Sequence, residues 1–223
     1  MRGSGGGPAA GGPGGDPVVV RVGGPPDAVS AADLHARLIS EGFLSSLGPR
    51  FLGRLYRRIT RSEGSFLLIA ESGGTTVGFI AGSVATGRLY RSFLTRDGIA
   101  AFLSAPVRLV TALPRVVETL RHGRAGPDDG ASGGELLAVA VDPRWRSRRV
   151  GHLLVEAFLR ELGDRDVGSA HVVVGAANEA AIAMYRRSGF AEARTFEMHP
   201  GTVSLVMQTE VPAPAVPSPR RRS

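Results

Sequence analysis

The segment best suited to chemistry is a basic turn that follows an apolar run and precedes an amphipathic stretch. The run ends at Asp142-Pro143, and Arg146, Arg148 and Arg149 follow it closely. An Asp-Pro pair predicts an extended exit from a strand, and the apolar spacing predicts a helix from about Val150. The first turn of a helix leaves backbone N–H groups without partners, and the helix dipole favours negative charge there. The pattern predicts an anion-binding loop, with a merely solvated basic turn as the alternative.

Three further residues near this turn and downstream of it have types that suit a binding site. Gly151 would let the backbone approach an anion without a Cβ in the way. Asn178 stands at the start of a predicted helix, where it is a good N-cap. Tyr185 follows two helical turns later, so both side chains are expected on the same side of that helix.

Taken in order, these segments resemble the GNAT family of N-acetyltransferases. The resemblance covers about residues 17 to 211, apart from 86 to 133, and is most specific from 135 to 190. One residue departs from the family pattern: Arg149 stands where the family usually has a small residue. Its side chain either points away and leaves the loop open or blocks close approach of a ligand. The motifs that carry the resemblance are Val139-Ala140-Val141-Asp142-Pro143, Arg146 with Gly151, and Asn178 with Tyr185, Gly189 and Phe190.

The resemblance implies acetyl-CoA as a co-substrate, with its pyrophosphate in the basic loop and no metal. Its pantetheine arm would lie between strands 135–141 and 171–176, with the Val139 N–H facing the thioester oxygen. A core strand is the simpler interpretation of the same apolar run, and both can hold together. The implied cofactor-binding residues are Val139, Ala140, Val141, Arg146, Ser147, Arg148, Arg149, Val150, Gly151, His152, Asn178 and Tyr185.

Two residues are predicted to be catalytic through the same resemblance. Tyr185 resembles the tyrosine that protonates the leaving thiolate, although packing of its helix against the sheet would explain it equally. Glu135 resembles the general base of some relatives. It lies about 13 Å along the strand from Val139, at ~3.3 Å per residue, so it would act through ordered water, helped by a strand bulge. The alternative for Glu135 is a solvated carboxylate at the strand edge.

Absent residue types exclude several chemistries. All 27 basic residues are arginines, so there is no lysine for a Schiff base or a Walker-type phosphate site. No cysteine is present to carry an acyl intermediate, so direct attack in a ternary complex is expected. The five histidines are scattered without metal-ligand spacing. The net charge of +7 comes without interleaved aromatic and basic residues, and nucleic-acid binding is not expected.

The predicted fold class is α/β (α+β): a GNAT-like mixed, mostly antiparallel central sheet with splayed middle strands and flanking helices. Apolar alternation predicts the strands and a 3.6-residue period predicts the helices. The predicted strands are 18–22, 65–70, 76–84, 135–141, 171–176, 190–198 and 203–211. The predicted helices run from Asp27 or Ser30 to Ile39, and over 47–60, 150–162 and 178–187.

Three segments lie outside this pattern. Residues 1–16 and 212–223 are rich in Gly, Pro or Arg and are predicted to be disordered, which leaves a domain over 17–211. Residues 86–133 form a predicted helical, basic insertion between the third and fourth strands. It is interpreted as a helical cap, with an acceptor-site lid or a basic surface helix as alternatives.

The predicted activity is transfer of an acetyl group to a primary amine of an unidentified acceptor. A small molecule is favoured over a protein, and the arginine-rich insertion suits an anionic acceptor near Glu41, Phe43 and Tyr56. The alternatives are a relative that binds acyl-CoA without turnover and a module that contacts anionic surfaces. No apolar run is long enough for a transmembrane helix, so a cytoplasmic location is expected; a homodimer is compatible with the sequence.

Overall fold

The computed structural model describes residues 16–39, 48–96, 133–199 and 202–213. Its centre is a seven-stranded sheet in the order β1-β2-β3-β4-β5-β7-β6, antiparallel at every junction except the parallel one between β4 and β5. The predicted strands are thereby confirmed within a few residues. The strands are β1 Val19–Val22, β2 Ser65–Ser72, β3 Thr75–Ser83, β4 Gly134–Val141, β5 Ser169–Gly175, β6 Ala191–His199 and β7 Thr202–Glu210.

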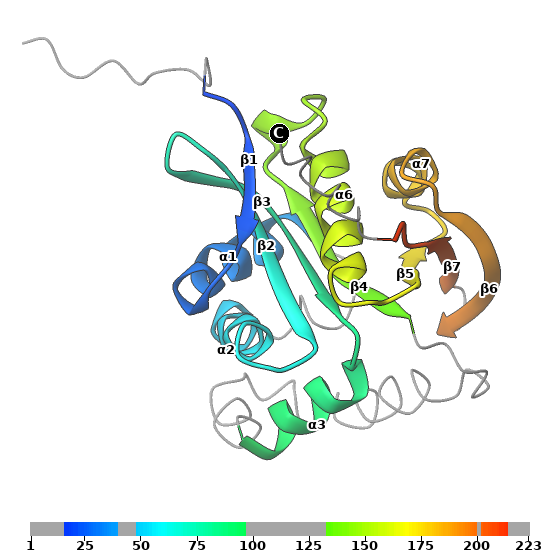
Figure 1. The fold of residues 1–223 in the computed structure, drawn as a ribbon, viewed down its shortest axis with the longest axis horizontal. Helices are drawn as coiled ribbons and strands as arrows, with labels where there is room; N and C mark the ends of the chain where they lie inside the picture. Colours follow the sequence, from blue (N-terminus) through cyan, green and yellow to red (C-terminus); the bar gives the residue numbers. More distant parts are fainter. Residues whose placement is uncertain (1–15, 40–47, 97–132, 200–201, 214–223) are drawn as a thin grey trace, which may run out of the picture.

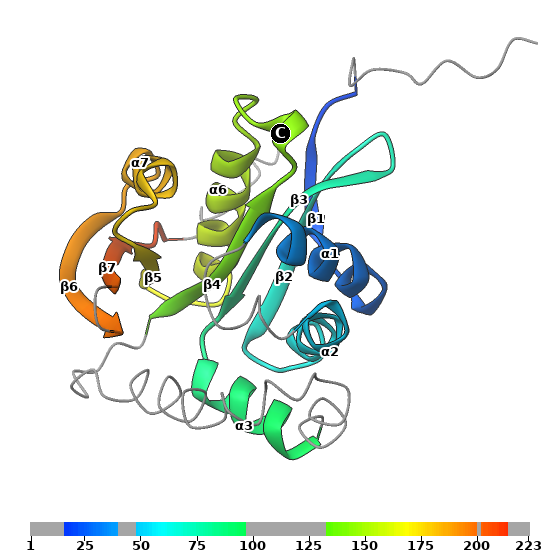
Figure 2. The same ribbon diagram turned by 180° about the vertical axis from the view of Figure 1, so that it is seen from behind.

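Helices cover both faces of the sheet (Figures 1 and 2). One apolar layer, with Phe158 and Met207, joins α6 and α7 to the first face. The other, with Tyr56 and Phe79, joins α1, α2 and α3 to the opposite face. The helices are α1 Ala28–Leu38, α2 Pro49–Ile59, α3 Thr86–Arg96, α6 Val150–Gly163 and α7 Glu179–Arg187, with short 3₁₀ turns at Pro25–Asp27 (η1) and Pro143–Trp145 (η4).

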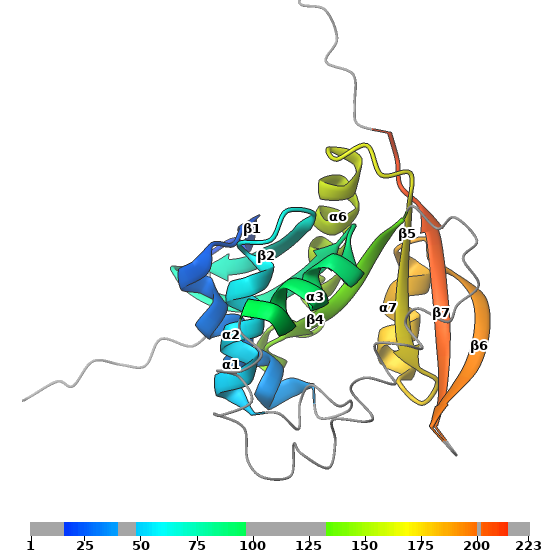
Figure 3. The same ribbon diagram turned by 90° about the horizontal axis from the view of Figure 1, so that it is seen from below.

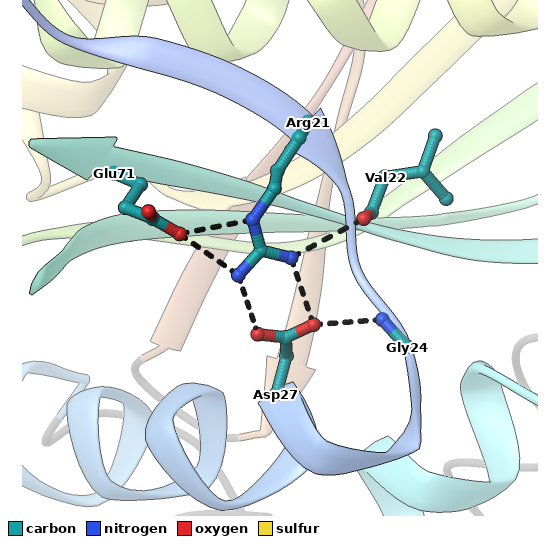
Figure 4. A network of polar contacts seen from close by, with 5 residues as sticks. All are labelled: Arg21, Val22, Gly24, Asp27 and Glu71. Atoms are coloured by element: carbon teal, nitrogen blue, oxygen red, sulfur yellow. Dashed lines mark hydrogen bonds and ion pairs between the residues drawn. The ribbon is translucent and has the colours of Figure 1, made fainter. Parts of the chain in front are cut away.

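The first strand and helix are tied together by one arginine (Figure 4). The Arg21 guanidinium donates to Glu71 Oε2 at 2.9 Å and to Asp27 Oδ1 at 2.8 Å. Asp27 also accepts from the Gly24 amide at 2.8 Å, and the bond from Arg21 lowers the pKa of its carboxyl. Asp27 stands at the N-cap of α1 as predicted, but its carboxylate holds the preceding turn instead of capping the helix.

The inserted segment begins directly after β3. Its first part is helix α3, which packs on α2 through an edge-to-face contact of Phe51 and Phe93, with ring centroids 5.2 Å apart. The remainder of the insertion, the predicted N-terminal tail up to residue 15 and the C-terminal tail from residue 214 lie outside the described residues. The part of the insertion that the structure describes therefore covers the α1–α2 side of the sheet.

The two central strands separate after a short shared stretch. β4 and β5 pair only over Gly134–Leu136 and Ala170–Val172, and they diverge beyond it (Figure 3). The predicted splay of the middle strands is confirmed, and it leaves one edge of β4 unpaired with β5 from Leu137 to Val141. Main-chain groups at such an edge can pair with another extended molecule.

A bulge in β4 lies at the point where the strands separate. Leu136 is opposite Gly82 and Ala138 is opposite Ala81, so Leu137 is the extra residue. Leu137 and Ala138 both pack into the layer beneath α1 and α2, whereas regular alternation would put them on opposite faces. A strand bulge was expected near Glu135, and the structure has one at Leu137, two residues after Glu135.

Candidate functional site

The basic turn is held at its start by Asp142. The Asp142 amide donates to the Val77 carbonyl at 2.9 Å, which keeps the residue on the sheet. Its carboxylate caps η4 by accepting from the Arg144 amide at 3.0 Å, and the Arg144 side chain lowers the pKa of the Asp142 carboxyl through a second hydrogen bond. The Asp142 carboxylate is therefore paired with Arg144, the first arginine of the turn.

The turn contains two residues in the left-handed region. Ser147 has φ 64° and Arg149 has φ 61°. A non-glycine residue in this region costs about 1–2 kcal/mol, which explains why a glycine is usual at the second position. The Arg149 side chain is exposed and makes no capping hydrogen bond to α6. The chain thus adopts the glycine-type conformation without the glycine.

The start of α6 offers hydrogen-bond donors to an anion. The first intrahelical bond runs from the Leu153 amide to the Arg149 carbonyl at 2.9 Å. The amides of Val150, Gly151 and His152 therefore have no acceptor within the helix. Exposed guanidinium groups of Arg146, Arg148 and Arg149 surround this helix end, and the Arg148 guanidinium lies 4.9 Å from the centroid of the Trp145 ring. Amide donors, a helix dipole and exposed guanidinium groups together fit a diphosphate.

Gly151 has a packing role in addition to the predicted one. A Cβ at this position would lie 2.7 Å from Sδ of Met184, so glycine allows α6 and α7 to approach closely. His152 joins the same two helices: its Nδ1 lies 3.1 Å from Ser188 Oγ, and its Nε2 lies 3.1 Å from Glu156 Oε1. Both imidazole nitrogens thus have partners in the protein.

Asn178 and Tyr185 lie at different depths on α7. The Asn178 Oδ1 accepts from the Ala181 amide at 3.2 Å, which makes it the N-cap. It is exposed, whereas Tyr185 is only 4% exposed. The N-cap residue has non-helical dihedral angles, φ −87° and ψ 66°, which let its side chain turn back to the Ala181 amide.

The Tyr185 hydroxyl keeps contact with solvent although its ring is buried. No residue of the described part hydrogen-bonds this hydroxyl, and none of the fully buried side-chain polar atoms there lacks a partner. The oxygen must therefore reach an opening. Burial raises the pKa of the Tyr185 phenol, so its proton stays in place at neutral pH. A protonated, accessible phenol can donate a proton to a bound group.

Alternate residues of β4 direct their main-chain groups into the space between β4 and β5. The Asp142 amide donates to β3, so the main-chain N–H and C=O groups of Ala140, two residues earlier, also point to β3. The main-chain groups of Val139 and Val141 point away from β3. Of the three β4 residues predicted to bind cofactor, two therefore present their main chain to the opening. An extended ligand could pair with them as a strand would.

Glu135 lies on the face of the sheet that α1, α2 and α3 cover. A Cβ at Gly134 would point at Leu162 of α6, so the next side chain points to the opposite face. On that face a cavity of about 10 Å³ lies among His35, Tyr56, Leu89, Tyr90, Leu137 and Ala138. Leu89 and Tyr90 come from the inserted segment. Burial raises the pKa of the Tyr90 phenol, and the negative charge of Glu135 raises it further.

Sequence reasoning missed His35 and Tyr90. The two come from α1 and α3 and line the same cavity as Tyr56 of α2. His35 Nδ1 lies 2.7 Å from the Tyr56 hydroxyl, and burial raises the pKa of the Tyr56 phenol, with a smaller contribution from Tyr90. Glu41 and Phe43, which were expected near the acceptor, lie outside the described residues. In the sequence, His35 and Tyr90 occupy ordinary helix positions, and only the packing of α1, α2 and α3 brings them to one cavity.

The described residues contain no cluster of histidine, aspartate and glutamate that could hold a metal ion. Within the same part of the chain, no helix is long and apolar enough to cross a membrane.

Comparison with known proteins identifies relatives of this arrangement. Residues 34–190 match the sequence model of a family described as the acetyltransferase (GNAT) family. A mycothiol acetyltransferase of Nocardiopsis dassonvillei is 42% identical over 67 residues, which are 30% of this chain and 20% of that protein. A [ribosomal protein bS18]-alanine N-acetyltransferase of Salmonella typhimurium is 43% identical over 58 residues, which are 26% of this chain and 39% of that protein. The matches span less than half the length of these curated relatives.

Solved structures share the fold at low sequence identity. The ribosomal-protein-S18-alanine N-acetyltransferase of Escherichia coli is 16% identical with a TM-score of 0.55, and the alignment covers 90% of this chain and 97% of that one. Ard1 of Thermoplasma volcanium is 19% identical with a TM-score of 0.56, covering 87% of this chain and 97% of that one. These similarities support the fold.

Proposed function

Because the chain belongs to the GNAT acetyltransferase family, we propose that it transfers an acetyl group from acetyl-CoA to a primary amine by direct attack. The domain that does so would span residues 17–211. The observation that carries this proposal is the separation of β4 from β5 directly beside the N-terminus of α6. It offers an extended edge for the pantetheine arm and amide donors for the pyrophosphate.

The anion-binding loop would hold the diphosphate. The amides of Val150, Gly151 and His152 donate to it, while Arg146, Arg148 and Arg149 supply charge from the rim. His152 acts through its backbone, since both its ring nitrogens are engaged elsewhere. Ser147, in the left-handed region, turns the loop back toward the helix end.

The β4 edge would orient the thioester. The Val139 amide faces the opening and can donate to the thioester oxygen as negative charge develops there. Val141 faces the same way and can pair with the pantetheine amides. Ala140, whose main chain is directed at β3, fixes the strand, and Asn178 caps the helix that carries Tyr185.

Two residues would move protons. Tyr185 donates its proton to the departing thiolate, since its hydroxyl is accessible and its raised pKa keeps it protonated. Glu135 accepts the proton that the acceptor ammonium must lose before its nitrogen can attack. Attack by the neutral nitrogen forms the amide bond, breaks the carbon–sulfur bond and releases CoA.

The acceptor would be a small amine. One relative is named a mycothiol acetyltransferase, and another is named a [ribosomal protein bS18]-alanine N-acetyltransferase. A panel should therefore contain an amino sugar, free amino acids, a polyamine and a peptide that begins with alanine. Release of the CoA thiol after mixing with acetyl-CoA identifies the acceptor.

Binding of acetyl-CoA to the loop is tested by charge reversal. Acetyl-CoA at 100 times its Kd should stabilise the protein by about 2.7 kcal/mol, seen as a rise in Tm. Arg146→Glu with Arg149→Glu should weaken binding at least tenfold. Arg50→Glu with Arg61→Glu removes the same charge from exposed positions away from the loop and should leave Kd within twofold. Equal effects of the two double variants would place the cofactor elsewhere.

The catalytic role of Tyr185 has its own test. Tyr185→Phe removes a hydroxyl that no described residue hydrogen-bonds, so the fold and acetyl-CoA binding should be unchanged. CoA release should fall about 100-fold or more. Unchanged turnover would remove Tyr185 from the mechanism.

A relative that binds acyl-CoA without turnover is the second candidate, favoured by Arg149 at a glycine-type position. It predicts a Tm rise with acetyl-CoA and no CoA release with any amine of the panel, and an acceptor-dependent release would exclude it.

A further inference from the structure

The net positive charge of the chain can be traced to α2, α3 and the turn after α2. Residues 49–61 and 86–96 carry eight of the 27 arginines and no aspartate or glutamate. The other 19 arginines are slightly outnumbered by the 20 acidic residues of the chain. The net charge of +7 is therefore concentrated on these two helices and is not spread evenly by an arginine-rich composition. The eight are Arg50, Arg54, Arg57, Arg58, Arg61, Arg88, Arg91 and Arg96.

Four of these residues form a row along α2, called the arginine row below: Arg50, Arg54, Arg57 and Arg61. Steps of four, three and four residues keep side chains on one side of a helix. Arg54 is half-buried, and the other three are exposed. At ~1.5 Å per residue, the row is about 16 Å long. The buried residues of α2 occupy the opposite side, against the sheet: Leu52, Leu55, Tyr56 and Ile59.

Helix α3 adds three exposed arginines beside the row. It packs on α2, and Arg88, Arg91 and Arg96 point away from its buried residues. Among the described residues, no ion pair is formed by any of the six exposed arginines of α2, α3 and the turn. The nearest acidic residue along the chain is the exposed Glu63. The two helices thus present a positive surface that the described residues leave open to a partner.

This surface lies away from the proposed cofactor site. Helices α2 and α3 pack in the apolar layer on one face of the sheet, and α6, which begins at the basic turn, packs in the layer on the other face (Figures 1 and 2). A partner on the arginine row would therefore leave the β4 edge and the start of α6 accessible.

We propose that the arginine row binds the phosphate backbone of a double-stranded nucleic acid. A guanidinium fork matches the geometry of a phosphate and can donate two hydrogen bonds to it. Side chains three or four residues apart on a helix start ~5–6 Å from one another, so the row offers a regular line of cations. A duplex carries one negative charge per ~1.7 Å of its axis, so about nine phosphates lie along the length of the row.

A duplex fits better than a single strand because of the aromatic residues of these helices. Phe51 and Tyr90 are half-buried, while Tyr56 and Phe93 are buried. Single strands are bound largely by stacking their bases on exposed aromatic rings, and α2 and α3 offer none within the described residues. The lack of aromatic residues among the basic ones speaks against stacking, but not against contacts with phosphates.

Two other anionic partners fit the row less well. A helix that binds a lipid surface buries apolar side chains in the membrane, whereas those of α2 already pack against the sheet. An acidic peptide matches a continuous row only where acidic residues alternate along it, because side chains on one side of an extended chain are about 6.6 Å apart. Since the row contacts phosphates and no bases, its binding is independent of nucleotide sequence. It also requires no acetyl transfer.

Fluorescence anisotropy with the full chain tests binding. The probes are a labelled 20-base-pair DNA duplex and an RNA duplex of the same sequence. The logarithm of the affinity should fall linearly with the logarithm of the NaCl concentration between 50 and 200 mM, with a slope of about −3.6 for four phosphates at ~0.9 each. The tighter of the two duplexes identifies the kind of nucleic acid. No binding to either duplex at 50 mM NaCl would overturn the proposal.

Two double variants with the same change in net charge separate the row from general attraction. Arg50→Glu with Arg61→Glu should weaken duplex binding at least tenfold and make the slope shallower by about 2. Arg146→Glu with Arg149→Glu, on the basic turn, should stay within threefold of the native protein, because charges beyond about 10 Å are screened at 0.1 M salt. Far-UV circular dichroism and Tm establish that both variants are folded.

The remaining outcomes also decide the proposal. Equal losses in the two double variants would show that net charge alone attracts the duplex. Unchanged binding by Arg50→Glu with Arg61→Glu would place the contact on another segment of the chain. Phosphatidylserine vesicles or poly-glutamate that bind the native protein more tightly than both duplexes would identify a lipid or an acidic protein as the partner. Each of these three results would overturn the assignment, whatever the protein does with acetyl-CoA.

Discussion

The hydroxyl of Tyr56 lies 2.7 Å from Nδ1 of His35, inside the apolar layer between the helices and the sheet. Both rings also contact Phe79, the His35 ring stacked on it and the Tyr56 ring at its edge. Burial lowers the pKa of His35 to about 4 and raises that of Tyr56, so both groups are neutral at physiological pH. The pair joins α1 to α2 at the wall of the cavity that Tyr90 completes.

The neutral imidazole of His35 makes the fold sensitive to acid. Its folded pKa of about 4 is below the unfolded value of 6.5, so the unfolded state binds the extra proton first. The free energy of unfolding should fall as pH drops from 6.5 to 4, by roughly 3 kcal/mol at most from this residue. Urea unfolding at pH 7, 5.5 and 4.5 measures it, and His35→Gln should flatten the profile while His171→Gln does not. Identical profiles for native protein and His35→Gln would contradict the assignment.

The buried phenols make the fold sensitive to alkali in the same way. Tyr56, Tyr90 and Tyr185 all have pKa values raised above 10, with burial as the first cause. Their contribution to the free energy of unfolding is fully present at pH values below 10. Above pH 10 the phenols of the unfolded protein ionise, and this contribution is lost as pH rises. Absorbance at 295 nm should show no tyrosinate in the folded protein at pH 10, whereas protein unfolded in guanidinium should be about half ionised. A normal titration of any one tyrosine in the folded protein would refute this.

Arg149→Gly should stabilise the protein. Arg149 adopts φ 61°, and glycine takes this conformation without the steric penalty of a Cβ. We expect a gain of about 1 kcal/mol, equivalent to a rise in Tm of about 2–4 °C for a chain of this size. Because backbone amides are proposed to hold the diphosphate, the Kd of acetyl-CoA should weaken by less than about threefold. A loss beyond tenfold would show that the guanidinium itself is the main contact.

Gly82→Ala should destabilise the sheet, and Gly53→Ala should not. A Cβ at Gly82 would lie 2.6 Å from ring atoms of both Phe66 and Phe158, in the layer beneath α6. Overpacking of this kind costs about 1–3 kcal/mol. Gly53 lies within α2 with nothing within 4 Å, so alanine there should stabilise by about 0.5–1 kcal/mol. Thermal unfolding of both variants measures the contrast, and a neutral Gly82→Ala would show that the two rings have room to move.

Most of the fold was predictable because its signals are local. Alternating apolar residues marked the strands, and Asn178 and Gly189 marked the start and end of α7, where Gly189 has φ 92°. The expectation that Asn178 and Tyr185 share one side of α7 stays a prediction, since Asn178 lies just outside the helix as its N-cap. The inserted segment gave weaker signals, and only α3 of it is described.

The sequence by itself determined the strands of the sheet and the position of the basic loop, because each depends on residues close together in the chain. Tertiary structure alone decided that His35, Tyr56 and Tyr90 line one cavity, and that the main-chain groups of Val139 and Val141 face the opening beside β5. The physical reason is that these relationships join residues far apart in the chain. They depend on how three helices pack on one face of a bulged strand, which no spacing within the sequence encodes.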